Sequence, residues 1–509
     1  MDLDLIIRNG VVVTAADIIP SCDIGIKDGE IVTLGRTLLL TATEEIDAEG
    51  AFITPGGIDS HCHLSQYYDP GPDEDQTTQT TNGTIPAQYD FAGDTYETGS
   101  RSAIAGGTTT IISFAVQLQK DDSLEPVIAE YHKLARGQAY CDYSFHVIVT
   151  NPSHTVLKKD LPALIERHGI SSIKIFMTYA TAKLTDYQIL DVLNVSRNQG
   201  ITTMVHAENA DLVQWMTDYL EEMSMVEPHF HGASRPPLVE GEATSRVVAL
   251  AEVLNAPILI VHVSSAVATK VIRKAQTRLL PVYGETCPHY LLLNGDRMKL
   301  PDFEGSKFVC SPPLRDDQAD LDACWEGIRN GTFTTFSSDH APTKYDHPNG
   351  KKKALCCHGG RFKDIPNGMP GLETRVPLLF TGGVLSGKIS PQRFVELTST
   401  NPARLYGLKK KGTIAVGYDA DLTIWHPQST FKPFRLTNAN LHHAIDYTPF
   451  EGFEFLNWPR YTLLRGKVMY AEGKIVGSMK DGRFLRRGPS QLRTGQMIEE
   501  SKWLKHSLQ

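Results

Sequence analysis

The sequence has few features of exported, membrane-spanning or nucleic-acid-binding proteins. Its eight cysteines form no Cys-x-x-Cys pair and mostly stand in apolar stretches, so we expect buried free thiols in a reducing compartment. No apolar run approaches bilayer-spanning length, and the first residues lack an export signal. A net charge of -9 over 509 residues, without a basic stripe, argues against nucleic acid as a partner. We therefore expect a cytoplasmic protein that binds neither nucleic acid nor membrane.

Two histidines separated by one residue, His61 and His63, close the largely apolar run 52–60. If this run ends as a β-strand, alternate side chains share a face, and both imidazoles can hold one cation. Two ordinary histidines at a strand end would give the same pattern. A metal site therefore requires further ligands from elsewhere in the chain.

Three further candidate ligands each stand directly after an apolar run. They are His206 after 201–205, His262 after 257–261 and Asp339 after 332–338. The carboxyl ends of the strands of a (β/α)8 barrel form one rim, where active sites of this fold lie. Because imidazole suits zinc among the common metals, four His and one Asp at this rim predict a divalent metal site.

The length and the distribution of strand patterns predict two structural units. Short strands broken by Gly and Asp occur near both termini, including a hairpin turn at Asp28-Gly29, and strands and helices alternate between them. We predict an α/β protein: a (β/α)8 TIM-like barrel with a small β-sandwich domain formed from both termini. The predicted units are 1–55 and 401–477 for the two parts of the small domain, 56–400 for the barrel and 478–509 for a C-terminal tail.

The alternating region predicts individual elements. Helices are expected near 124–135, 185–198, 240–254, 264–276 and 316–329, and another is expected to end at Gly106-Gly107. His146 lies inside the predicted strand 143–149, so we expect a core histidine there. We place His289, His340 and His358 outside the direct ligands, and the lysine clusters 351–353 and 409–411 are interpreted as solvated loop charges.

One predicted strand, 169–179, contains a lysine, Lys174, among apolar residues. Burial lowers the pKa of a lysine because desolvation penalises the charged form, and the neutral amine is nucleophilic. One alternative is a buried salt bridge with a carboxylate. Beside four histidines and an aspartate, a second role is open to Lys174. It can take up carbon dioxide and become a carbamate that bridges two metals.

In combination these motifs resemble the amidohydrolase superfamily, and within it the dihydropyrimidinase and D-hydantoinase branch. The matching segments are 55–63, 174–179, His206 and His262 with their neighbours, 286–290, 309–315, 337–342, 365–373 and 447–452. The resemblance covers residues 3 to about 487. These motifs are specific together and weak singly.

The resemblance implies a site with two Zn2+ ions per subunit and an N6-carboxylated lysine. The implied metal ligands are His61, His63 and Asp339 for one ion, His206 and His262 for the other, and carboxylated Lys174 bridging both together with a hydroxide. The implied catalytic residues are Asp339, as general base and then acid, and Tyr179, as oxyanion donor. The implied substrate-binding residues are Tyr179, Ser311 and Asn367, the last two through backbone groups. From the sequence alone, Ser311 also fits a turn residue before Pro312, and Asn367 a left-handed turn residue before Gly368.

The implied activity is ring opening of a small cyclic amide. The resemblance favours 5,6-dihydropyrimidines such as dihydrouracil and dihydrothymine, opened to N-carbamoyl-β-amino acids in pyrimidine catabolism by a homotetramer. The alternatives are a hydantoinase or allantoinase acting on other cyclic imides or ureides, and a non-catalytic scaffold relative. All six ligand positions are filled, which argues against the scaffold, and no arginine closely follows His63, as a dihydroorotase would require.

Two segments depart from this pattern or extend beyond it. The segment 65–94 is longer than in most relatives, and its Pro, Gly, Thr and Asp content predicts a loop over the rim. We expect Tyr67, Tyr68 or Tyr89 to contact the ring substituent. A disordered loop with no role in binding would have the same composition. The C-terminal tail has little local core to join, so we expect it to contact a neighbouring subunit.

Overall fold

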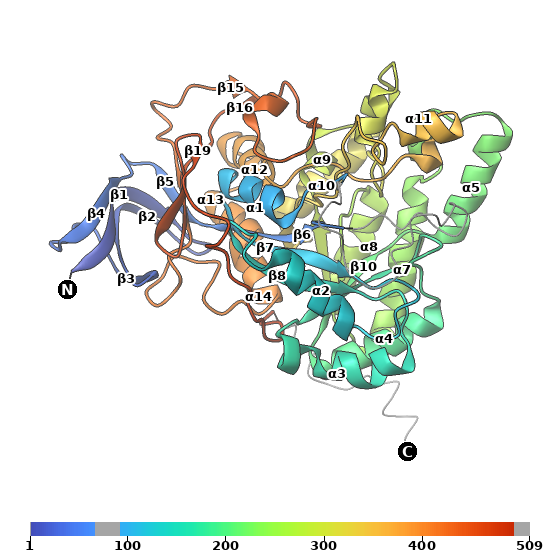
Figure 1. The fold of residues 1–509 in the computed structure, drawn as a ribbon, viewed down its shortest axis with the longest axis horizontal. Coiled ribbons are helices and arrows are strands. Elements are labelled where there is room, and N and C mark those ends of the chain that lie inside the picture. The colour runs from blue at the N-terminus through green and yellow to red at the C-terminus, as the bar shows by residue number, and fades with distance from the viewer. Residues whose placement is uncertain (1, 67–91, 493–509) are drawn as a thin grey trace.

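The computed structural model describes residues 2–66 and 92–492, apart from the side chains of residues 357 and 358. Figure 1 shows two units: a barrel surrounded by helices, and a sheet at the left that contains the N-terminal strands. The predicted candidates Tyr67, Tyr68 and Tyr89 and the tail beyond residue 492 lie outside the described residues.

Eight parallel strands form the barrel, which confirms the predicted fold class. In chain order they are β6 (Gly57–Cys62), β7 (Thr108–Val116), β8 (Asp142–Ile148), β9 (Ser172–Phe176), β10 (Thr202–His206), β11 (Ile258–Ile260), β12 (Val282–Thr286) and β13 (Thr335–Phe336), each paired with the next. The ring closes after β13, where Cys62 and His340 form a parallel bridge and the His63 N–H donates to the His340 carbonyl at 2.7 Å. This closure brings the end of β6 beside the segment that follows β13.

Helices alternate with these strands and cover the barrel. The main ones are α1 (Tyr96–Ala105), α2 (Glu125–Ala135), α4 (Asp186–Gln199), α5 (Ala210–Glu222), α7 (Pro237–Leu254), α8 (Ala266–Thr277) and α10 (Gln318–Asn330). Shorter helices are α3 (Leu161–Ala163), α6 (Phe230–Ala233), α9 (Pro288–Leu292), α11 (Lys353–His358), α12 (Arg375–Leu379), α13 (Pro391–Val395) and α14 (Asn401–Leu405). The predicted helices are confirmed to within a few residues, and α1 ends with Gly106 at its C-terminal cap, as expected.

The second unit is a nine-stranded sheet built from both ends of the chain. Its strands are β1 (Leu3–Val13), β2 (Ile18–Lys27), β3 (Glu30–Gly35), β4 (Ala42–Asp47), β5 (Phe52–Pro55), β14 (Leu422–Trp425), β17 (Pro459–Leu464), β18 (Lys467–Ala471) and β19 (Lys474–Ile475). The two sets meet where β5 pairs antiparallel with β14. The hairpin turn predicted at Asp28-Gly29 joins β2 to β3 with positive φ at both residues, as a type I′ turn requires. A separate ribbon pairs β15 (Phe434–Arg435) with β16 (Glu454–Phe455).

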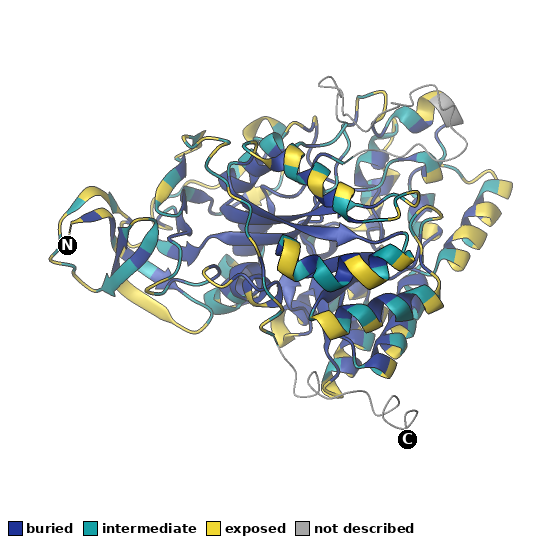
Figure 2. Cartoon of the chain, turned by 60° about the horizontal axis from the view of Figure 1, so that its bottom comes forward, coloured by how far each residue is buried: buried dark blue, intermediate teal, exposed yellow. Residues whose placement is uncertain are grey.

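The barrel strands are buried almost throughout, whereas the helices expose their outer faces (Figure 2). His146 in β8 is fully buried and contacts Ser172 and the Ser60 carbonyl, which confirms the predicted core histidine. Six cysteines are buried free thiols, as expected, and Cys356 is exposed. Within the described residues, no helix combines the length and the apolar character that a membrane crossing needs.

Lys411 joins the two units, which corrects its interpretation as a solvated charge. Its ammonium is buried and pairs with Asp142 at 2.7 Å, with Asp419 at 2.9 Å and with Asp421 at 2.6 Å. Asp142 begins barrel strand β8, whereas Asp421 immediately precedes β14 of the terminal sheet. Burial disfavours the charged amine, but the three carboxylates outweigh this effect and raise the pKa of Lys411. The ion cluster therefore stabilises the contact between barrel and sheet.

Replacing this lysine, Lys411→Met, should strongly destabilise the protein. Removal of one partner from a buried ion cluster leaves uncompensated carboxylates, at a cost of about 3–5 kcal/mol. Urea unfolding followed by circular dichroism should show a lower midpoint. The control is Lys410→Met, since Lys410 pairs with Glu30 at the surface and its loss should leave the midpoint near that of the wild type. Equal midpoints for the two variants would contradict the assigned role of Lys411.

Candidate metal centre

The predicted ligands lie at the carboxyl-terminal rim of the barrel. His61 is near the end of β6, Lys174 is in β9 and His206 ends β10. His262 follows β11 by two residues, and Asp339 follows β13 by three. These five come from different strands, and His63 directly follows β6, so the barrel geometry rather than local sequence brings the set together.

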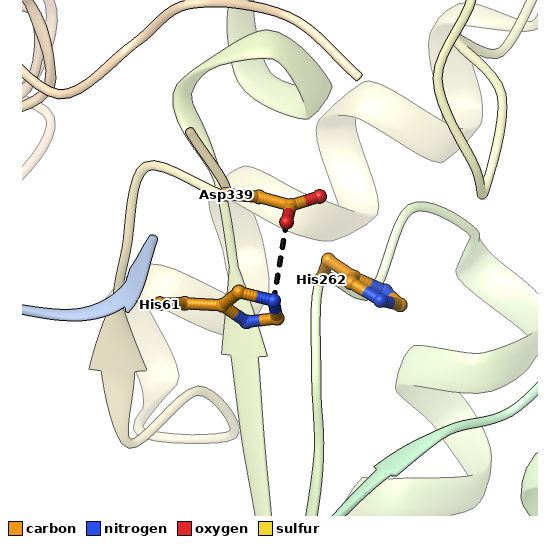
Figure 3. A group of neighbouring side chains, drawn as sticks. All are labelled: His61, His262 and Asp339. Carbon is orange, nitrogen blue, oxygen red and sulfur yellow. Dashed lines mark ion pairs between the residues drawn. The ribbon is translucent and has the colours of Figure 1, made fainter. Parts of the chain in front are cut away.

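Three of these residues form a compact cluster of possible metal ligands (Figure 3). One donor atom from each of His61, His262 and Asp339 lies within 4.8 Å of the others, and all three residues are buried. Asp339 Oδ1 lies 3.1 Å from His61 Nε2.

The other three predicted ligands adjoin this cluster. His63 Nε2 lies 3.7 Å from Asp339 Oδ1, and the His206 ring centroid lies 4.5 Å from that of His262. Lys174 Nζ lies 2.9 Å from His61 Nε2. The structure thus places His63, Lys174 and His206 each next to a member of this cluster.

Two buried carboxylates orient the imidazoles, and the sequence analysis missed this role for both. Glu285 Oε1 lies 2.6 Å from His61 Nδ1, and Glu208 Oε2 lies 2.7 Å from His206 Nε2. A carboxylate that accepts from one ring nitrogen leaves the opposite nitrogen available as a metal ligand. Glu285 in β12 and Glu208 just beyond β10 occupy the same rim as the ligands, and this placement was the signal that could have identified them.

Burial sets the electrostatics of the centre. It lowers the pKa of Lys174 to about 8, so the neutral amine is more accessible near neutral pH than in an exposed lysine. Within the described residues, no carboxylate forms an ion pair with Lys174, so the alternative of a buried salt bridge is not realised there. Burial disfavours the Asp339 anion, but His61, His63 and His262 hold the pKa of Asp339 well below its usual range. Asp339 is therefore an anionic donor beside a reactive amine.

The residues present fit divalent metal ions. Imidazoles and a carboxylate are the donors that zinc-type sites use. The Nδ1 atom of His262 is buried and has no hydrogen-bond partner among the described residues, and a buried polar atom of this kind needs a ligand.

Three residues of the rim have backbone conformations that non-glycine residues rarely adopt. The φ angles are +67° at Tyr179, +39° at His262 and +46° at Asp339. Such left-handed conformations cost of order 1–3 kcal/mol and persist where the surrounding structure over-determines them, often at functional sites. These three residues lie just beyond the ends of their strands, where the chain turns away from the barrel wall. The barrel therefore fixes the directions in which their side chains point.

Tyr179, a predicted substrate-binding residue, lies beside the cluster and contacts a second one, Ser311. The Tyr179 ring contacts that of His206, with centroids 5.3 Å apart, and its hydroxyl interacts with the Ser311 side chain. Burial raises the pKa of Tyr179 to about 12, so the phenol keeps its proton. Asn367 is half-buried, and its Oδ1 has no partner among the described residues. The expectation of a left-handed Asn367 is wrong: Gly368 takes the positive φ, +112°, because glycine alone has no Cβ penalty there.

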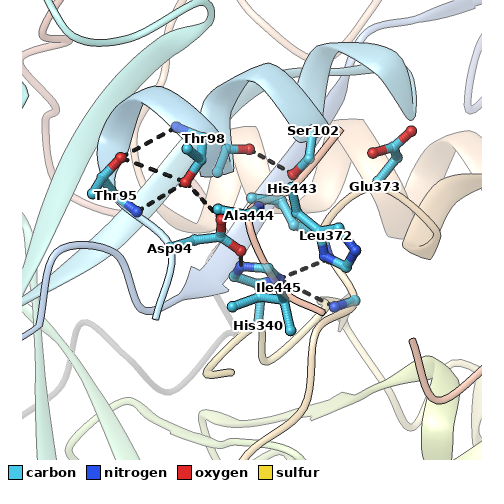
Figure 4. Close-up of polar contacts among 12 residues, drawn as sticks. Asp94, Thr95, Thr98, Ser102, His340, Leu372, Glu373, His443, Ala444 and Ile445 are labelled. Carbon is cyan, nitrogen blue, oxygen red and sulfur yellow. Dashed lines mark hydrogen bonds and ion pairs between the residues drawn. The ribbon is translucent and has the colours of Figure 1, made fainter. Parts of the chain in front are cut away.

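His340, which immediately follows Asp339, is held in a buried polar network (Figure 4). Its Nδ1 accepts from the N–H groups of Gly371 and Leu372, so its Nε2 carries the proton and donates to Asp94 Oδ2 at 3.0 Å. Asp94 also accepts from the Ala444 N–H at 2.8 Å. This network immobilises the peptide next to Asp339, which agrees with the prediction that His340 is not a direct ligand.

Comparisons with known proteins match nearly the whole chain to one group of enzymes. The model of the Amidohydrolase family matches residues 52–469. A D-hydantoinase of Ralstonia pickettii is 39% identical over 489 residues, which cover 95% of this chain and 99% of that protein. The solved dihydropyrimidinase of Brevibacillus agri superposes with a TM-score of 0.86 at 37% identity, covering 96% of this chain and 99% of that one. The D-hydantoinase (dihydropyrimidinase) of a Thermus species gives a TM-score of 0.86 at 34% identity, with 96% and 100% covered.

Removing the acceptor of His61 should weaken metal binding. In Glu285→Gln the amide no longer provides a charged acceptor for His61 Nδ1–H, so we expect metal affinity to fall about 10- to 100-fold. Competition with a graded chelator, read by elemental analysis, measures this loss.

The matched control is Glu373→Gln, because Glu373 accepts from His442 Nδ1 at 2.9 Å outside the cluster. Metal affinity should stay unchanged in this control. A loss of equal size in both variants would exclude a specific role for Glu285.

Proposed function

The chain belongs to the amidohydrolase family, and from this premise we propose that it is a metal-dependent hydrolase that opens the ring of small cyclic amides. The observation that carries the proposal is the rim cluster of His61, His262 and Asp339 with the buried amine of Lys174 beside it. We propose two zinc ions, with His61, His63 and Asp339 at one, His206 and His262 at the other, and N6-carboxylated Lys174 between them.

Two divalent ions bound there would lower the pKa of a shared water and polarise the carbonyl of the scissile amide. Asp339 would accept the proton of the attacking water and return it to the leaving ring nitrogen. The Tyr179 hydroxyl, protonated and buried, donates to the carbonyl oxygen as negative charge develops on it. The peptide groups of Ser311 and Asn367 orient the ring by binding its amide edge.

The proposed substrates are 5,6-dihydropyrimidines, opened to N-carbamoyl-β-amino acids as in pyrimidine catabolism. The fold-level match to a dihydropyrimidinase over nearly the whole chain supports this choice. Hydantoins are the second candidate, because several curated relatives are named D-hydantoinases. Both substrate types present the same amide edge, so they differ chiefly in ring size and substituent.

We also propose a homotetramer in the cytoplasm. Supporting assembly, α5 exposes Trp215 and Tyr219, whose rings stack, and Met223 at the C-terminal cap of the helix is exposed as well. An exposed apolar stripe of this kind marks an interaction surface. A monomer mass by light scattering would overturn the proposed assembly.

The central test compares wild type with Lys174→Ala for metal content and for hydrolysis of dihydrouracil, hydantoin, 5-phenylhydantoin and allantoin. The wild type should hold about two zinc ions per subunit and open dihydrouracil. The variant should lose the bridging ligand and with it both metal and turnover. Elemental analysis and loss of amide absorbance give the two readouts.

The outcomes separate the candidates. Turnover of hydantoins without dihydrouracil would keep the chemistry and change the substrate. Full metal and full activity in Lys174→Ala would refute the role of Lys174, and a wild type that binds no metal would refute the proposed mechanism.

A further inference from the structure

Lys351 has a buried amine that, among the described residues, pairs with no carboxylate. Its side chain is fully buried, and Nζ donates to the carbonyls of Val309 at 2.9 Å, Pro366 at 2.6 Å and Gly368 at 2.7 Å. Within the described part of the chain, no carboxylate pairs with it. The interpretation of residue 351 as a solvated loop charge is therefore wrong, because the ammonium donates all three protons inside the protein.

The three carbonyls belong to the two segments that carry the proposed substrate-binding residues. Val309 precedes Ser311 by two positions, and the carbonyls of Pro366 and Gly368 flank Asn367. The Gly368 N–H also donates to the Val309 carbonyl at 3.0 Å. Lys351 thus crosslinks the two segments around one direct hydrogen bond.

Other buried side chains bind the peptide groups next to Ser311. His231 Nε2 lies 2.8 Å from the Cys310 carbonyl, and the Tyr290 hydroxyl donates to the Pro312 carbonyl at 2.6 Å. The backbone N–H and carbonyl groups of Ser311 and Asn367, by contrast, have no hydrogen-bond partner among the described residues. The network therefore binds the neighbours and leaves these two peptides available to a ligand.

The position of Lys351 is energetically unfavourable for folding alone. Burial of an ammonium without a paired charge is costly, and it lowers the pKa of Lys351 to about 7. A methionine or leucine would fill similar volume without this penalty. The amine instead holds three carbonyls at a fixed spacing. Binding groups that are already held in place improve affinity, because less of the protein has to be ordered when the ligand binds.

We propose that Lys351 is a positioning residue that holds the peptide groups of Ser311 and Asn367 at the spacing of a cyclic amide's N–H and C=O edge. The inference rests on the proposed function for its substrate class. The crosslink that Lys351 makes between the two segments, called the clamp below, is a property of the fold and can be measured without turnover.

The test is Lys351→Met, with Lys352→Met as the matched control in the same segment. Lys352 directs its ammonium to Asp346 at 3.5 Å, near the surface. For the best substrate of the wild type, Lys351→Met should raise KM by about tenfold or more with kcat changed by less than about threefold, as expected when ground-state and transition-state binding are lost equally. Lys351→Gln keeps two N–H donors and should give an intermediate KM. The control should retain the KM of the wild type.

Hydrogen–deuterium exchange provides the readout that does not depend on activity. In Lys351→Met the peptides covering 306–313 and 365–370 should exchange faster than in wild type, while strands β7 to β10 stay unchanged. An unchanged exchange pattern, or an unchanged KM in a folded Lys351→Met, overturns the inference. Failure of both Lys351 variants to fold also overturns it, since it would assign Lys351 to folding. Faster exchange with no wild-type turnover of any cyclic amide would leave the clamp standing and refute the proposed function.

Discussion

Closure of the barrel between β6 and the segment after β13 is the contact on which the rim depends. The hydrogen bond from the His63 N–H to the His340 carbonyl joins the first and last strands of the ring. It places Asp339 beside His61 although 278 positions separate them in sequence. Without this closure the remaining ligands would still follow their strands, but they would lack the carboxylate. The cluster of His61, His262 and Asp339 is thus a consequence of a closed parallel sheet.

Three buried lysines have different roles because their neighbouring groups differ. Lys411 lies among three aspartates and keeps its charge, which joins barrel and terminal sheet. Lys174 lies between the rings of Phe114 and Phe176 beside His61, where desolvation favours the neutral amine. Lys351 contacts carbonyl dipoles only. Partner type, rather than burial, decides whether the lysine is a structural cation, a reactive amine or a spacer.

The candidate ligands were predictable from the sequence because the histidines and Asp339 stand at the ends of apolar runs and Lys174 stands inside one, and the fold places such runs together. The rim position of Glu285 could be predicted in the same way, but its histidine partner could not, and neither could the role of Lys351. The role of Glu285 depends on which histidine faces it across the barrel, and Lys351 stands in a lysine cluster that looks like a surface loop. The left-handed residue was misassigned to Asn367 instead of Gly368 because turn statistics favour both. Local patterns thus gave the strands and the direct ligands, whereas partners supplied by distant segments required the three-dimensional structure.

Asp94 and Ser65 have a consequence for how this enzyme can change. The Ser65 N–H donates to the Asp94 carbonyl at 2.8 Å, and the Asp94 side chain is fixed by His340. Ser65 and Asp94 therefore hold together the two points at which the chain leaves the barrel and returns to it. We call this pair of residues the stem. Since the entropy of closing a segment grows only slowly with its length, sequences of different size can be grafted onto this stem while the catalytic rim stays intact. The stem is therefore a point at which segments of different length can be exchanged.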